Sequence, residues 1–338
     1  MGKSLLLAIW ICVCSAAFAA EQPYGRPPFA IPPRQGTITD YWRPVKGGQP
    51  LNLQREPLVV MIQDLHANVG VQKNIAAILY RLNRLNKERG LLVCVEGASG
   101  EGDVSLLRSL PRLIRRGFEE MLLRRAYLTG AELAATETAA DALQQGGVLW
   151  GRFKSYFVKS QTPAPVSLST IHLWGVDDPD LYRKNWRAAK QVDKYGPQAL
   201  NYLRPTKGIL KEGAGKSMQK QLDLVTKLLM LRLQPDEYRA YLQGRALNPQ
   251  GPPVYQQTVK LAEEYYLAAD QRSHAMADNL KKRMGADAGI TVLISGGFHT
   301  GEIGEILKKR NIPFAVITPD VKVLDQDQAY KARLREEE

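Results

Sequence analysis

Mainly apolar runs, far apart in the chain, are the feature that most constrains its fold. They cover residues 57–62, 91–95, 171–176, 290–295 and 313–317. Strands that are buried on both faces of a parallel sheet are continuous apolar runs, whereas half-exposed strands alternate apolar and polar residues. The sequence therefore predicts an α/β fold with a central mixed, mainly parallel sheet.

Helical periodicity separates these predicted strands. Between the first two strands, apolar residues recur with helical spacing at Val71, Ile75, Ile78, Leu79, Leu82 and Leu85. Two strands joined by such a helix form a right-handed βαβ unit with parallel strands. The last unit repeats the pattern, with a turn at 296–301 and a helix at 302–310. Both ends of the domain thus build the sheet, and a large helical insertion, about 104–165 and 180–285, forms its middle.

The first 19 residues have the features of a secretory signal peptide. Lys3 precedes a short apolar run at 5–13, and Ala17-Phe18-Ala19 provides an A-x-A cleavage site. We therefore expect an exported protein, periplasmic or secreted after cleavage near Ala19. An uncleaved N-terminal anchor is the alternative.

A single α/β domain is predicted at 54–325, between two segments without apolar periodicity. Residues 20–53 are rich in Pro and Gly and are interpreted as an arm, and 326–338 form a charged C-terminal tail. Cleavage near Ala19 leaves Cys94 as the only cysteine, so an intramolecular disulfide is excluded in the mature form. Cys94 lies within a predicted strand and is expected to be buried.

The charge of the chain bears on its partners. Lys and Arg number 46 against 34 acidic residues, a net charge of +12 that is spread along the chain. No basic stripe with interleaved aromatic residues is present, so the pattern is not that of a nucleic-acid-binding protein. At most, it indicates peripheral contact with an anionic membrane surface.

Polar groups that follow the predicted strands are the candidate site residues. His66 follows the first strand, and Asp64, two positions earlier, faces the same way in an extended chain. Glu96 ends the second strand, where a carboxylate is costly to bury unless it is paired or bound to a cation. Ligands in open α/β folds bind at the carboxyl ends of the strands, so these groups are predicted to converge there. The alternative is structural: His66 as a hydrogen-bonding residue, and Glu96 as a helix cap or partner of Arg272.

Three further groups complete the candidate site. His299 lies in Gly296-Gly297-Phe298-His299-Thr300-Gly301, where glycines allow a close backbone approach to a ligand. One residue of Asp177-Asp178 is expected to cap the following helix, and the other to face the crevice. Arg272 shares a helix face with Met276 and either binds a substrate carboxylate or oxyanion or pairs with Glu96.

Together these segments resemble the superfamily of erythromycin esterases, Tiki-type proteases, TraB proteins and ChaN-like haem-binding lipoproteins. In that superfamily a G-x-x-H or G-E-x-H motif ends the first strand and a Glu ends the second. An Arg-x-x-x-Met-Ala helix and a second G-x-x-H follow. The counterparts here, in the same order, are Gln63-Asp64-Leu65-His66, Val95-Glu96-Gly97, Arg272-Ser273-His274-Ala275-Met276-Ala277 and Gly296-Gly297-Phe298-His299.

The resemblance covers roughly 57–100 and 268–318, the two ends of the domain. Gln63 stands where the first motif has Gly, and Asp64 stands where ChaN-like members have Glu. The resemblance implies a mixed α/β fold with helical additions. Its members differ between hydrolysis, metal-dependent proteolysis and haem binding, and a fold alone does not define a function.

The leading hypothesis is an exported hydrolase that cleaves a peptide, ester or amide bond in a small-molecule or peptide substrate. In its metal-dependent form, the ligands of a divalent ion such as Mn²⁺ or Zn²⁺ come from the set His66, Glu96, His299, Asp64 and Asp177. In its metal-free form, His66 is the general base. Arg272 stabilises the developing oxyanion in both forms.

Two alternatives belong to other classes of protein. One is a haem- or iron-binding protein of the cell envelope, with His66 or His299 as the axial ligand of the haem iron. The other is a non-catalytic envelope interaction protein with a decayed site, an alternative that the change to Gln63 leaves open.

Overall fold

The computed structural model describes residues 25–44, 51–65, 68–86, 90–137, 170–210, 215–285 and 289–321, without the side chains of 204–210. The chain divides into two compact units. Unit 1 comprises Met1–Val176, Leu280–Thr300 and Gly304–Glu338, and unit 2 comprises Asp177–Asn279 and Gly301–Ile303. Most of the second part of the predicted helical insertion, about 180–285, falls in unit 2.

Strands and helices alternate in the first half of the chain, and helices dominate the second. The strands are β1 (Gly36–Trp42), β2 (Pro57–Asp64), β3 (Leu91–Val95), β4 (Ser99–Gly102), β5 (Ile171–Val176), β6 (Gly289–Gly296) and β7 (Phe314–Pro319). The helices are α2 (Val69–Leu85), α3 (Ser105–Ser109), α4 (Arg112–Arg124), α5 (Gly130–Thr136), α7 (Pro179–Leu210), α8 (Lys216–Leu229), α9 (Pro235–Gln243), η1 (Arg245–Leu247), α10 (Pro253–Met284) and α11 (Gly297–Lys309).

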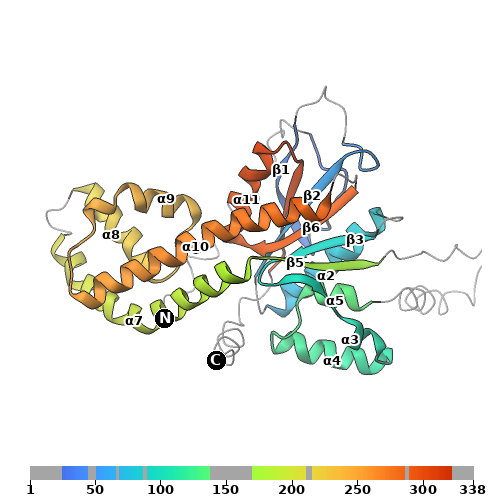
Figure 1. The fold of residues 1–338 in the computed structure, drawn as a ribbon, viewed down its shortest axis with the longest axis horizontal. Coiled ribbons are helices and arrows are strands. Elements are labelled where there is room, and N and C mark those ends of the chain that lie inside the picture. The colour runs from blue at the N-terminus through green and yellow to red at the C-terminus, as the bar shows by residue number, and fades with distance from the viewer. Residues whose placement is uncertain are drawn as a thin grey trace, which may run out of the picture. The chain divides into compact units, whose positions relative to one another are not determined.

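The seven strands form one mixed sheet in unit 1, in the order β1-β7-β2-β6-β3-β5-β4. The five inner strands are parallel, and the edge strands β1 and β4 are antiparallel to their neighbours. β2, β6 and β3 lie side by side at the centre of the sheet (Figure 1). The fold class is the predicted one: a mainly parallel sheet built from both ends of the chain. Three of its predicted strands are confirmed as direct neighbours.

The centre of the sheet is covered on both faces, which explains the apolar runs there. Leu58, Val60 and Ile62 of β2 belong to the core that α2 completes. Met61 points to the other face, because successive side chains of a strand alternate. There it packs beside Gly304 of α11, where an added Cβ would lie 3.7 Å from the Cε of Met61. Residues 58–62 are all fully buried, and each large side chain among them contributes about 1.5–3 kcal/mol.

A close backbone approach beside β5 positions the turn that follows β3. Gly97 in that turn has φ +79°, a conformation that favours glycine. A Cβ on Gly175 in β5 would lie 2.2 Å from the carbonyl carbon of Ala98. A side chain at position 175 would therefore collide with the turn. Glycine leaves room for the turn that follows Glu96 and connects β3 to β4.

Two strands were not predicted. β1 falls within residues 20–53, which were predicted to be an arm, and it pairs with β7 instead. β4 falls between the predicted strand at 91–95 and the predicted helical insertion. Both are edge strands whose sequences are interrupted by polar residues or glycine, so neither produces the continuous run of a buried strand. The predicted signal peptide, the charged tail and residues 138–169 of the insertion lie outside the described residues.

Unit 2 is a helical unit built from α7, α8, α9, η1 and most of α10. Tyrosines contribute much of its core: Tyr241, Tyr255 and Tyr266 are each at most 2% exposed. The hydroxyl of Tyr266 accepts a hydrogen bond from the backbone N–H of Leu233 at 2.7 Å, which satisfies a buried donor between two helices. In the part of the chain that the structure describes, no helix combines the length and apolar composition needed to cross a bilayer.

The contact at Gly175 predicts a large loss of stability on substitution. Gly175→Ala places a methyl group against backbone that cannot move aside, so we expect the free energy of unfolding to fall by about 3 kcal/mol or more. Chemical denaturation measures this. Gly117→Ala in α4 is the matched control, because a Cβ there meets open space, and it should leave stability unchanged or slightly raised. Equal effects of the two substitutions would contradict the β4–β5 packing.

Cys94 is predicted to be unreactive in the folded protein. It is fully buried, and burial raises the pKa of its thiol from the ordinary 9.0 to about 12, partly offset by Arg283. Thiol reagents attack the thiolate, so labelling in a Cys12→Ser/Cys14→Ser background should require unfolding. The unfolded thiol ionises at lower pH than the folded one, so the free energy of unfolding should fall as pH rises from 9 towards 12. Rapid native labelling would show that β3 is not buried.

Candidate functional site

Glu96 is held at the carboxyl end of β3 by two hydrogen bonds to β6. Its backbone N–H donates to the carbonyl of Ile294 at 3.0 Å, which extends the parallel pairing by one residue. Its side-chain Oε2 accepts from the backbone N–H of Gly296 at 2.7 Å. The carboxylate thus lies beside the end of β6, and its orientation is defined by the backbone of that strand.

His299 comes to the same place from the first turn of α11. The predicted turn at 296–301 is wrong, because the helix begins at Gly297, directly after β6, with Gly296 as its N-cap. This start brings His299 back over the strand end. Its Nε2 lies 3.2 Å from Oε1 of Glu96, and both side chains are nearly buried, 5% and 12% exposed. We call this pair the Glu96–His299 dyad.

A neutral His299 with its ring proton on Nε2 directs that proton towards Glu96, because a carboxylate only accepts hydrogen bonds. In that tautomer the basic lone pair is on Nδ1. The carboxylate, 3.2 Å from Nε2, stabilises the imidazolium that forms when Nδ1 accepts a proton. Burial strengthens this interaction because the local dielectric is low. Such an arrangement suits a histidine that acts as a base or as a ligand.

The predicted partners at the end of β2 are only partly described. Asp64 and Gly296 are register partners, so β2 and β6 end at the same edge of the sheet, as predicted. The carboxylate of Asp64, however, is bound on the α2 side, where its Oδ1 accepts from Nε2 of Gln72 at 2.6 Å. Gln63, in place of the motif Gly, accepts a hydrogen bond from Thr318 at 2.7 Å. His66 lies outside the described residues.

Arg272 and Asp177 form a buried pair within unit 2. The guanidinium donates to both oxygens of Asp177, with NH2 to Oδ2 at 2.6 Å, and its NH1 donates to Oδ1 of Asn185 at 3.0 Å. Asp178 caps α7, as expected for one residue of the pair, by accepting from the N–H of Leu181 at 2.9 Å. The structure therefore gives Arg272 a carboxylate partner inside its own unit, and it gives Asp177 a cation.

Of the described candidate residues in unit 1, the structure brings Glu96 and His299 together. Asp64 is bound to Gln72, and Asp177 to Arg272, so both carboxylates proposed as extra metal ligands already have strong partners. The described members of the proposed ligand set therefore do not supply three ligands for one ion, the number that a catalytic zinc site requires.

A different trio was missed by sequence reasoning. Asp270, His274 and Glu302, all in unit 2, place ligand atoms within 4.8 Å of one another. Asp270 and His274 are four apart on α10 and so share a face, which was a detectable signal. Glu302 also pairs with Arg239 at 3.1 Å, so a cation already neutralises part of this group. The side chain of His274 is 55% exposed.

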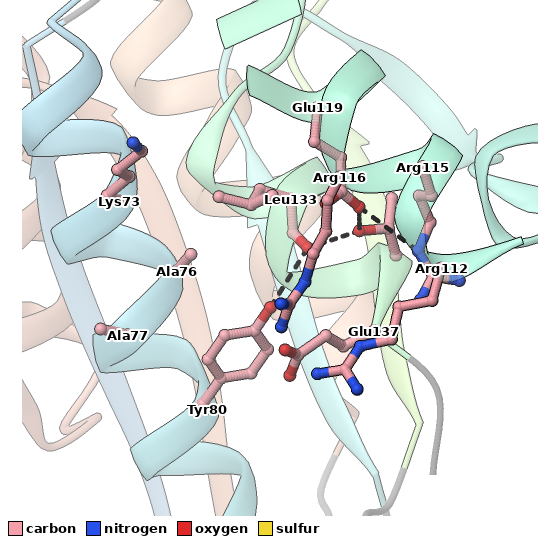
Figure 2. Close-up of a pocket in the computed structure, with 11 residues that line it drawn as sticks. Lys73, Ala76, Ala77, Tyr80, Arg112, Arg115, Arg116, Glu119, Leu133 and Glu137 are labelled. Carbon is pink, nitrogen blue, oxygen red and sulfur yellow. Dashed lines mark hydrogen bonds and ion pairs between the residues drawn. The ribbon is translucent and has the colours of Figure 1, made fainter. Parts of the chain in front are cut away.

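Two cavities lie elsewhere. The first, about 210 Å³, lies in unit 1 between α2, α4 and α5 (Figure 2). Charged and apolar side chains line it: Lys73, Ala76, Ala77, Tyr80, Arg112, Arg115, Arg116, Glu119, Leu133, Thr136 and Glu137. The second, about 300 Å³, lies in unit 2 beside α7 and α10. Neither is lined by Glu96 or His299.

Comparisons with protein-family models, curated proteins and solved structures give no match to this chain. The relation to the erythromycin esterase, Tiki, TraB and ChaN-like superfamily therefore stays a resemblance based on four short motifs. The candidate site is argued from its own geometry.

The buried pair predicts a specific stability pattern. Arg272→Ala removes the cation paired with Asp177, whose carboxylate is 2% exposed, so the free energy of unfolding should fall by about 3–5 kcal/mol. Removing Asp177 as well should restore part of that loss. The exposed pair of Arg183 with Asp180 is the matched control, and Arg183→Ala should cost about 1 kcal/mol at most. Denaturant titrations measure these free energies. If the losses of the two single variants simply add up in the double variant, the pairing is contradicted.

Proposed function

We propose that this chain is an exported hydrolase that cleaves an ester, amide or peptide bond, with the Glu96–His299 dyad at its reaction centre. One observation carries the proposal: a buried histidine whose Nε2 lies 3.2 Å from a carboxylate oxygen, at the carboxyl ends of two adjacent parallel strands. Ligand sites of open α/β sheets occur at this edge. His–carboxylate pairs activate water or hydroxyl nucleophiles in hydrolases of unrelated fold.

In the proposed reaction, His299 removes a proton from a water molecule as the water oxygen attacks the carbonyl carbon of the substrate. Glu96 stabilises the imidazolium that results. The bond from the carbonyl carbon to the leaving oxygen or nitrogen then breaks, and the imidazolium returns the proton to the leaving group. General acid–base catalysis of this kind contributes about 10²–10⁴-fold to the rate.

The metal-free form is the better supported of the two predicted forms. Glu96 and His299 lie 3.2 Å apart, and Asp64 and Asp177 are engaged by Gln72 and Arg272. His66 was the predicted base. The proposal gives this role to His299, because His299 is the buried histidine with a described carboxylate partner. Arg272 has a structural partner in unit 2, so the proposal assigns it no step.

Export is the part of the proposal that rests on sequence alone. Its support is the run at 5–13 followed by Ala17-Phe18-Ala19. A substrate met outside the cytoplasm, a peptide or a small ester or amide, is consistent with that location.

The proposal predicts loss of hydrolysis when the dyad is broken. On a panel of chromogenic esters and peptides, His299→Ala and Glu96→Gln should each lower kcat by about 10²–10⁴-fold while circular dichroism stays native. Glu96→Gln keeps the shape of the side chain but removes the charge that stabilises the imidazolium. His172→Ala is the matched control, because His172 is exposed and should retain activity.

Unchanged hydrolysis in both dyad variants would refute the proposal. A shifted Soret band with haemin, abolished by His299→Ala in protein without hydrolase activity, would instead support the haem-binding alternative.

A further inference from the structure

α4 has the reverse of the usual amphipathic arrangement. Its charged residues Arg115 and Glu119 face the protein and are 4% and 9% exposed. They pair at 3.6 Å (Figure 2). Glu119 also accepts a hydrogen bond from Thr136 of α5 at 2.5 Å. A surface helix normally buries its apolar stripe and exposes its charges. The inner face of α4 therefore buries an ion pair and one apolar residue, Leu123.

The outer face of α4 is apolar. Leu113, Ile114, Phe118 and Met121, which share one side of the helix at 100° per residue, are 87%, 52%, 46% and 39% exposed. We call these four residues the α4 apolar face. Leu106 in the preceding helix is 77% exposed. Of the twelve exposed large hydrophobic residues in the described chain, six lie between positions 106 and 127, so the exposure is concentrated and not scattered.

The charges around this face are positive. Between positions 105 and 127 the chain has six arginines and two acids, Glu119 and Glu120. Glu119 is buried against Arg115, and Glu120 is bound by Lys73 and Arg124, each pair at 2.7–2.8 Å. Arg124 and Arg125 are exposed at the C-terminal end of the apolar face. An occupant of the face therefore meets apolar side chains bordered by cations.

The chain's own insertion does not fit this description. Residues 138–169 contain Arg152, Lys154 and Lys159 against a single acid, Asp141, so a contact between this segment and the α4 region joins like charges. A second copy of the chain has the same difficulty, because the same basic border faces itself.

We propose that the α4 apolar face docks on an anionic lipid surface, with Leu113, Ile114, Phe118 and Met121 at the level of the acyl chains and Arg124 and Arg125 at the lipid phosphates. Helices that lie in a membrane interface have this combination of large apolar residues and bordering Lys or Arg. The inference is independent of the dyad: it assigns a membrane-facing side to unit 1, and it holds whether or not the protein is a hydrolase.

A probe on the face tests the proposal directly. Met121→Cys, in a full-length chain with Cys12→Ser and Cys14→Ser, carries an environment-sensitive fluorophore, while buried Cys94 stays unlabelled. Vesicles of equimolar phosphatidylcholine and phosphatidylglycerol should shift its emission to the blue, and phosphatidylcholine alone should shift it much less. Leu267→Cys, on unit 2 and similarly exposed at 46%, is the control and should not shift. A local probe also excludes a signal from the apolar run at 5–13.

Affinity measurements complete the test. In vesicle titrations followed by the probe at 121, Leu113→Ser/Ile114→Ser/Phe118→Ser should weaken binding by about tenfold or more, because each side chain loses its apolar burial. Arg124→Gln/Arg125→Gln should weaken binding to anionic vesicles by about tenfold and hardly change binding to neutral ones. Leu242→Ser/Leu247→Ser, exposed apolar residues of unit 2, are the matched control and should have no effect.

Three results would overturn the proposal. Emission at position 121 that is already blue-shifted without lipid and insensitive to vesicles shows that another part of the chain covers the face. A second copy of the chain is the occupant if the emission at position 121 shifts with protein concentration in the absence of lipid. Sedimentation would then show dimers that Leu113→Ser/Ile114→Ser/Phe118→Ser abolishes. No shift at any lipid concentration shows a face that stays in water.

Discussion

The insertion of β6 between β2 and β3 is the constraint on which the rest of unit 1 depends. β6 pairs in parallel with both neighbours, so the centre of the sheet is completed by a strand that lies about 200 positions after β3 in the sequence. Parallel pairing fixes where the strands end, and all three carboxyl ends therefore lie at one edge. The fully buried residues of these strands hold that register, because a slip by one residue would exchange the two faces.

Two short connections turn this register into the Glu96–His299 dyad. Gly97 and Gly175 let the chain turn directly after Glu96, and α11 begins directly after β6 and carries His299 in its first turn. The N–H of Gly296 then holds the carboxylate that orients the imidazole. The positions of both catalytic candidates thus follow from backbone hydrogen bonds, which are less sensitive to surface substitutions than side-chain packing.

Sequence reasoning predicted the buried strands well, because a strand covered on both faces leaves a continuous apolar run. It missed β1 and β4, whose edge positions need no such run. It also predicted that Glu96 and His299 meet, since both follow parallel strands. It could not predict that Asp64 binds Gln72, eight positions away, or that Arg272 binds Asp177, 95 positions away. No local sequence pattern identifies these particular partners. The outward apolar side of α4 has ordinary helical periodicity, and only the structure shows which side is buried.

The central claim is that Glu96 fixes the tautomer and orientation of His299. The most direct test is a long-range ¹H–¹⁵N correlation spectrum of the imidazole rings in alkaline buffer. The chain has four histidines, and His299→Ala identifies which signals belong to His299. The account predicts one tautomer for His299, with the proton on Nε2, and a shift of that resonance in Glu96→Gln. A mixture of tautomers, or a proton on Nδ1 that is indifferent to Glu96→Gln, would contradict it.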